Sequence, residues 1–150
     1  MVLIINISPK NIKENTASEI LKRAQELHVK RLVIDSLSAL SINTPTTYSS
    51  VADLTEISIQ RFMYLFIDDI REYNTGITAL LITQAIKGQL SRDTISEFIC
   101  DGIINIAYDA LGGKYSRSLT IQKMRETKHD EDVHPLEISD KGITIHKYKD

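Results

Sequence analysis

A carboxylate that directly follows an apolar run is the feature of this sequence most suited to chemistry. Residues 31–40 read Arg-Leu-Val-Ile-Asp-Ser-Leu-Ser-Ala-Leu, so apolar and β-branched positions lead into Asp35 and the hydroxyl of Ser36. A buried parallel strand delivers such side chains to its carboxyl end, where ligand sites form in open α/β sheets. From these residues alone, two roles for Asp35 stay equally open: coordination of magnesium or water, and anchoring of the chain after the strand.

Two later segments carry polar groups that could serve the same chemistry. Thr83 and Gln84 follow the next apolar run, where the amide could contact a γ-phosphate or position water, or could cap the segment that follows. Lys123 and Arg125 are expected on one face of a strand, so both could reach one anion, and Arg offers bidentate geometry to phosphate. Taken alone, however, this basic run is better explained as a solvated strand end.

The elements that must position these residues alternate between strands and helices and then become strands only. We expect strands buried on both faces over residues 2–7, 32–35 and 77–82. Helices are expected over residues 16–28, 50–73 and from 91 or 93 to 99, the first with a capping box at Thr16-Ala17-Ser18-Glu19. Residues 43–47 read as a loop, and Gly76 as the C-cap of the long helix.

An antiparallel meander is expected after residue 100. Strands are predicted over residues 102–108, 115–124 and 142–148, with Gly112-Gly113 as the turn between the first two. The predicted fold class is therefore α/β, with a parallel sheet flanked by helices and followed by a β meander, in one domain over residues 1–150.

Composition argues against several classes of protein. The 150 residues carry a net charge of −2, so no global positive field favours nucleic acid. Cys100 is the single cysteine, which excludes an intrachain disulfide and fits a reducing compartment, and the four histidines lack the spacing of a zinc site. No apolar run approaches the roughly 20 residues of a membrane span, and residues 1–7 do not resemble a signal peptide. We expect a cytoplasmic protein without a membrane partner.

Taken together, three segments resemble the KaiC-like branch of the RecA superfamily, a group of archaeal and bacterial ATPase domains related to KaiC and to RadA paralogues. Residues 31–40 look like the Walker B block, and residues 77–84 resemble the following strand and its polar sensor. The tail is the most specific part. There the order and spacing of the family reappear in residues 101–104, Gly112-Gly113, Lys123-Met124-Arg125, Thr127, His129 and residues 138–143.

The resemblance implies a ring of subunits with ATP and Mg²⁺ bound between neighbours. By position, Asp35 would hold the metal in the chain's own site, with Ser36, Thr83 and Gln84 beside the nucleotide and Gln84 in a catalytic role. A second set would serve the site of the next subunit, with Arg125 acting catalytically. Its members are Lys123, Met124, Arg125, Thr127, His129, Ser139 and Asp140.

The sequence also departs from the family pattern. No G-x-x-x-x-G-K-[ST] loop occurs in the 150 residues, so the P-loop, its strand and helix, and the catalytic glutamate pair are missing. Glu126 stands where the family has a small residue, usually Gly. We therefore interpret the chain as the C-terminal part of a KaiC-like ATPase, which by itself neither hydrolyses ATP nor binds ATP and Mg²⁺ appreciably.

Two alternative functions and the expected partners follow from the same residues. The chain could be a short non-catalytic paralogue that completes the ATP site of a partner, or a DNA-associated recombinase paralogue with a patch of Lys87, Arg92, Lys114 and Arg117. Without a P-loop strand, the strand over residues 77–83 lacks a neighbour. Either residues 103–108 fill that place, or a second copy covers the edge. We favour self-association, or assembly with a full-length KaiC-like subunit.

Overall fold

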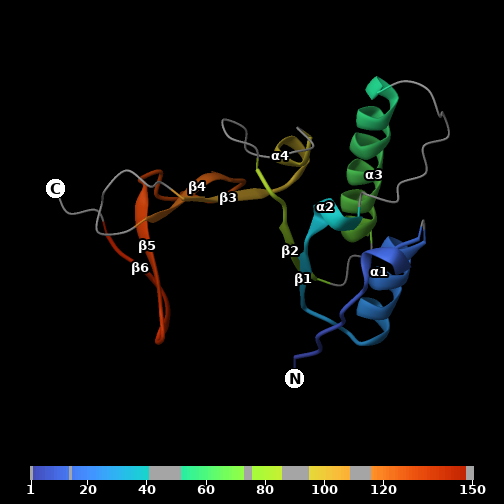
Figure 1. The fold of residues 1–150 in the computed structure, drawn as a ribbon, viewed down its shortest axis with the longest axis horizontal. Helices are drawn as coiled ribbons and strands as arrows, with labels where there is room; N and C mark the ends of the chain where they lie inside the picture. Colours follow the sequence, from blue (N-terminus) through green and yellow to red (C-terminus); the bar gives the residue numbers. More distant parts are fainter. Residues whose placement is uncertain are drawn as a thin grey trace. The chain divides into compact units, whose positions relative to one another are not determined.

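The chain folds into two compact units, residues 1–99 and residues 100–150, which are described separately (Figure 1). A computed structural model describes residues 2–13, 15–40, 52–72, 76–85, 95–108 and 116–147. The loop expected at residues 43–47 and the turn expected at Gly112-Gly113 lie outside these ranges. Within the described residues, no helix is both long and apolar enough to cross a membrane.

The first unit combines a parallel pair of strands with helices. Its elements are η1 (Pro9–Asn11), α1 (Thr16–Glu26), β1 (Arg31–Asp35), α2 (Leu37–Leu40), α3 (Ala52–Glu72), β2 (Thr78–Ile82) and α4 (Ser96–Ile99). β1 and β2 pair in parallel, from Arg31 opposite Thr78 to Asp35 opposite Ile82. The α/β class is therefore confirmed, and the strands and helices expected from α1 onward are present, together with the short helix α2, which was not predicted.

The core of this unit forms where α1, α2 and α3 meet one face of the strands. Leu37, Met63 and Phe66 are its most deeply buried large side chains. The ring of Phe66 stacks on that of Phe62, with 5.9 Å between centroids. Around them lie Ile12, Ala17, Leu21, Ile34 and Leu40. Leu65 on α3 is 50% exposed, because the buried stripe of this helix runs through Met63, Phe66 and Ile67 instead.

Two details at the ends of α1 follow from local hydrogen bonding. Thr16 is the first helical residue rather than the N-cap, and its Oγ1 accepts a hydrogen bond from the backbone N–H of Lys13 at 2.8 Å. The predicted capping box is therefore placed one residue too late. At the other end, His28 has φ 51°, and the N–H of Val29 donates to the carbonyl of Ala24 at 2.9 Å. This is the Schellman pattern, with His28 in the place that Gly usually takes.

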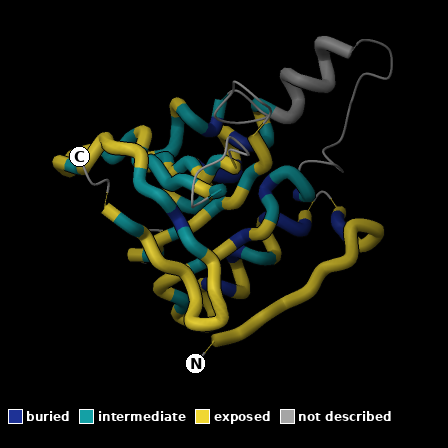
Figure 2. Tube along the Cα trace, turned by 60° about the vertical axis from the view of Figure 1, so that its left-hand side comes forward, coloured by how far each residue is buried: buried dark blue, intermediate teal, exposed yellow. Residues whose placement is uncertain are grey.

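The prediction of a strand over residues 2–7 is wrong. These residues form no strand and are exposed, Val2 to 88% (Figure 2, yellow segment at the N-terminus). An apolar run favours burial but does not supply the neighbouring strand that its backbone needs. Burial of β1 and β2 on both faces is also wrong, since Val33 is 60% and Leu80 52% exposed. The helices cover only the face that carries Ile34 and Leu81.

The second unit is a four-stranded antiparallel meander in the order β3-β4-β5-β6, as predicted in class. The strands are β3 (Gly102–Tyr108), β4 (Arg117–Met124), β5 (His134–Ser139) and β6 (Gly142–Ile145). β5 was not predicted, and it contains Pro135, a residue that is rare in the interior of a sheet. Pro135 still takes part in the meander, since its carbonyl accepts a hydrogen bond from the N–H of His146 at 2.9 Å. The strand expected to reach residue 148 ends at Ile145.

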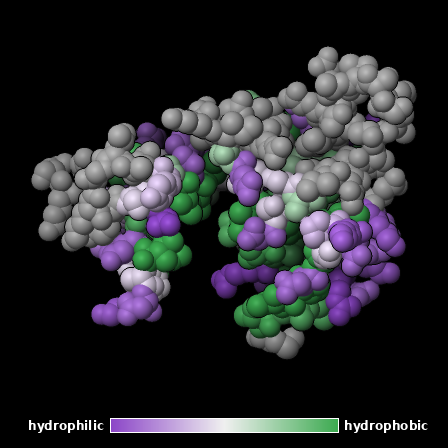
Figure 3. Space-filling model, viewed as in Figure 1, coloured by the Kyte–Doolittle hydropathy of each residue, from purple (hydrophilic) through white to green (hydrophobic). Residues whose placement is uncertain are grey.

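The register places most large apolar side chains of this sheet on one face. Tyr108 lies opposite Arg117, Arg117 opposite Leu136, and Leu136 opposite Ile145, so these positions share a face. Exposed members of the same set are Ile104, Ile106, Tyr108, Ile138, Ile143 and Ile145. Hydrophobic side chains thus reach the surface in both units (Figure 3). Among the described strands, β2 pairs only with β1.

Candidate functional site

The carboxyl ends of β1 and β2 bring the first group of expected site residues to one edge. Asp35 lies opposite Ile82 in the last step of the register, so Ser36 and Thr83 leave the sheet side by side. The strands are parallel, and polar groups at this edge of a parallel sheet converge on the usual place for a ligand. The hydroxyls of Ser38 and Thr83 lie 3.3 Å apart, which ties the two strand ends together. Sequence reasoning predicted this edge.

Ser36 and Ser38 have structural roles at this edge that the sequence analysis left open or missed. The backbone N–H of Ala39 donates to the carbonyl of Ser36 at 3.0 Å and to its Oγ at 3.3 Å, so Ser36 caps the short helix α2. The peptide bond between Asp35 and Ser36 is cis. Ser38 was not singled out, because its partner Thr83 lies 45 residues away in the sequence.

The donors at this edge fit a magnesium ion that arrives on a nucleotide. The carboxylate of Asp35 is exposed, and the hydroxyl of Thr83 and the exposed amide of Gln84 follow β2 at the same edge. Mg²⁺ keeps several waters and usually takes one or two carboxylates together with substrate phosphates. The described part of the chain contains no group of three or more His, Cys, Asp or Glu side chains that could form a protein cage for a metal.

The second group of expected residues lies where β4 ends. Lys123 and Met124 close the strand opposite Ile103 and Gly102, and Arg125 begins the turn. The N–H of Arg125 donates to the carbonyl of Asp101 at 2.8 Å, and its Nη1 lies 3.2 Å from Asp101 Oδ1. The expectation that Lys123 and Arg125 share one strand face is therefore wrong, because the strand stops between them.

The backbone at Glu126 explains why β4 stops. Glu126 has φ 56°, in the left-handed region that favours glycine. An L-residue with a side chain in this conformation carries local strain, and the chain can no longer continue as an extended strand. The KaiC-like pattern has a small residue, usually Gly, at this position, between Arg125 and Thr127.

A carboxylate that sequence reasoning missed organises the segment after this turn. Asp130 Oδ1 accepts a hydrogen bond from the N–H of Asp132 at 2.9 Å, and its Oδ2 lies 3.3 Å from His134 Nε2. The N–H of Asp132 is the main reason that the pKa of Asp130 is lowered, and the charge of His134 adds to it. His129 Nδ1 lies 3.2 Å from the carbonyl of Asp130. Thr127 is exposed in the turn itself.

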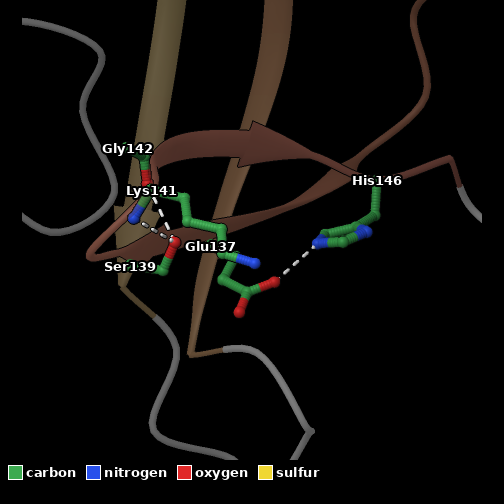
Figure 4. A network of polar contacts seen from close by, with 5 residues as sticks. All are labelled: Glu137, Ser139, Lys141, Gly142 and His146. Carbon is green, nitrogen blue, oxygen red and sulfur yellow. Dashed lines mark hydrogen bonds and ion pairs between the residues drawn. The ribbon is translucent and has the colours of Figure 1, made fainter.

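Ser139 closes β5, and Asp140 begins the tight turn that leads into β6. Figure 4 shows Ser139 beside Lys141 and Gly142 at this turn. Ser139 Oγ donates to the carbonyl of Gly142 at 3.4 Å and accepts from the N–H of Lys141 at 3.3 Å. Ser139 therefore holds the turn, which leaves Asp140 exposed at its tip. Glu137 Oε2 on β5 lies 2.9 Å from Nε2 of His146, the residue that follows β6.

Comparison with known proteins identifies the family. A family model described as "ATPase: KaiC" matches residues 4–150. The chain belongs to the KaiC ATPase family. A KaiC-like protein of Pyrococcus horikoshii has a similar crystal structure, with a TM-score of 0.68 and 29% identity, over 89% of this chain and 56% of that one.

Curated relatives of the KaiC-like chain are about twice as long as the region they share with it. A UPF0273 protein of Thermotoga maritima is 34% identical over 131 residues, which are 86% of this chain and 49% of that protein. A UPF0273 protein of P. horikoshii is 32% identical over 133 residues, 87% of this chain and 49% of its own length. The chain thus spans about half the length of these relatives.

The patch considered for DNA binding gains no support from the described residues of the KaiC-like chain. Lys87, Arg92 and Lys114 lie outside them. The guanidinium of Arg117 lies over the ring of Tyr108, with Cζ 5.4 Å from the ring centroid. A cation held over an aromatic ring in this way has a structural role within the sheet.

Proposed function

We propose that these 150 residues carry two of the parts from which a KaiC-like ATP site is assembled. One part is the edge formed by Asp35, Ser36, Thr83 and Gln84, which would contact Mg²⁺-ATP within the same subunit. The other is the basic end of β4, which would reach the nucleotide of the next subunit. The observation that carries the proposal is the shared edge, where Asp35 ends β1, Thr83 follows the end of its parallel partner β2, and Thr83 contacts Ser38.

Each residue has a distinct task in this scheme. Phosphoryl transfer depends mainly on positioning and on charge stabilisation around the transferred group. Asp35 would hold a Mg²⁺ ion, which would offset negative charge on the nucleotide, and Gln84 would orient water. Arg125 would neutralise charge that develops on the phosphates of the neighbouring site.

These 150 residues would not hydrolyse ATP by themselves. A P-loop supplies most of the phosphate contacts in such sites, and the printed sequence has none. The same two parts would serve equally in the C-terminal part of an ATPase and in a short paralogue that completes the site of a partner.

Calorimetry with Mg²⁺-ATP tests the proposal. The isolated chain should bind weakly and show no hydrolysis, and micromolar affinity would contradict this expectation. After addition of a P-loop-bearing N-terminal half from a KaiC-like relative, binding should tighten and depend on Mg²⁺. Asp35→Asn should remove that magnesium dependence, whereas Asp68→Asn, which neutralises an exposed carboxylate on α3, should preserve it. Equal behaviour of the two variants would refute the role of Asp35.

A further inference from the structure

The start of β3 holds the end of β4 through contacts that converge on Arg125. The carbonyl of Asp101 accepts the backbone N–H of Arg125 at 2.8 Å, and its carboxylate lies 3.2 Å from Nη1 of the same residue. One residue thus fixes both the main chain and the side chain of Arg125. The two side chains are 48% and 72% exposed, so the ion pair alone is weak, but the backbone hydrogen bond keeps its partners together.

Neighbouring contacts fix the strand from which Arg125 emerges. A Cβ added to Gly102 would lie 2.9 Å from Met124 Sδ and 3.2 Å from Met124 Cε, so the glycine leaves room for the thioether. The register also shifts between Ile103 and Ile104, opposite residues 121–123. Such a bulge redirects the side chains that follow it. The orientation of Lys123 and Met124 is therefore set from β3.

We propose that Asp101 is a positioning residue for Arg125. This inference rests on the proposed role of Arg125 across the subunit interface. An arginine side chain loses much conformational freedom when it binds a phosphate, and a carboxylate that already restrains it reduces this loss. Asp101 therefore acts through Arg125 and does not itself contact the nucleotide.

Positioning and simple electrostatics predict opposite effects when the charge of Asp101 is removed. Asp101→Asn keeps the backbone carbonyl and the size of the side chain, so the β3–β4 ladder is retained. Removal of a negative charge makes this region more attractive to ATP, so KM should stay the same or fall. Loss of restraint on Arg125 should lower kcat, by about fivefold for an exposed pair. A purely structural defect would not produce this split.

The experiment measures ATP turnover by a mixed assembly of this chain with a P-loop-bearing KaiC-like subunit. Asp101→Asn, Arg125→Ala and the double variant are compared, with Glu131→Gln as a matched control that removes an exposed charge after β4. The expected result is a roughly fivefold fall in kcat for Asp101→Asn without a rise in KM, and no further fall in the Arg125→Ala background. In the isolated chain, NMR order parameters of the Arg125 side chain should fall in Asp101→Asn.

The outcomes separate this inference from the proposed function. If Arg125→Ala leaves turnover unchanged, the role of Arg125 across the interface is refuted, and the positioning role is refuted with it. If Arg125→Ala lowers turnover but Asp101→Asn matches wild type, only the positioning role is overturned. It is also overturned if the effect of Asp101→Asn persists in full without Arg125, or if the order parameters of Arg125 do not change.

Discussion

Replacement of Glu126 by glycine should stabilise the second unit, because the backbone there already has the conformation that glycine prefers. Glu126 has φ 56° in the turn after β4. The left-handed conformation costs a residue with a side chain roughly 1–2 kcal/mol. Glycine removes this cost but loses about 0.5–1 kcal/mol more backbone entropy on folding. The net gain in the free energy of unfolding should be about 0.5–1 kcal/mol.

Urea unfolding measures this gain, with hydrogen exchange of the backbone amides of β4 and β5 as the readout. At roughly 2–4 °C per kcal/mol for a chain of this size, Tm should rise by about 1–4 °C. Glu126→Ala removes the same side chain and charge but leaves the backbone cost in place, so it should give no comparable gain. Glu126→Asn should fall between the two. Equal stabilisation by alanine and glycine would show that charge, and not backbone conformation, governs this turn.

Three further predictions concern the core, the acid limb of stability and the exposed sheet. Phe66→Ala should cost about 3–5 kcal/mol in urea unfolding, because this ring is 1% exposed, whereas Leu65→Ala should cost far less. The backbone N–H of Asp132 lowers the pKa of Asp130 in the folded chain. This hydrogen bond therefore stabilises the fold fully at pH values above the pKa that Asp130 has in the unfolded chain. The stabilisation is lost as the pH falls through the pKa that Asp130 has in the folded chain. In Asp130→Asn, the free energy of unfolding should no longer show this decrease when it is measured at falling pH. Sedimentation should detect self-association that Leu80→Glu weakens, and a strictly monomeric wild type at high concentration would contradict it.

The sequence predicts elements well where a strong period meets a clear boundary. α3 and β3 were predicted within two residues of their observed ends, because apolar spacing marks both elements and Gly102 marks the start of β3. β5, which contains Pro135, was missed. A proline can lie in this strand because the neighbouring residues pair with β4 and β6. The failed prediction at residues 2–7 has the same origin. Local composition does not reveal whether a strand finds a partner.

The candidate site also has one part that the sequence predicts and one part that it does not. Parallel topology alone indicates that Asp35 and Thr83 share an edge, and the structure places them so. The contacts of Ser38 with Thr83, 45 residues apart, and of Asp101 with Arg125, 24 residues apart, have no local sequence signal. Both join segments that meet only after the sheets form. Residues such as Ser38 and Asp101 can therefore be identified from the folded structure but not from the sequence motif.

ATP turnover by a confirmed mixed assembly tests the central claim most directly. The assembly contains this chain and a KaiC-like subunit with an intact P-loop, at saturating ATP. Arg125→Ala in this chain should lower turnover by on the order of 10³-fold, the effect of removing an arginine finger. Lys128→Ala, which removes an exposed cation three residues further on, should leave turnover unchanged. Unchanged turnover with Arg125→Ala would show that the basic end of β4 is solvated and does not serve the neighbouring site.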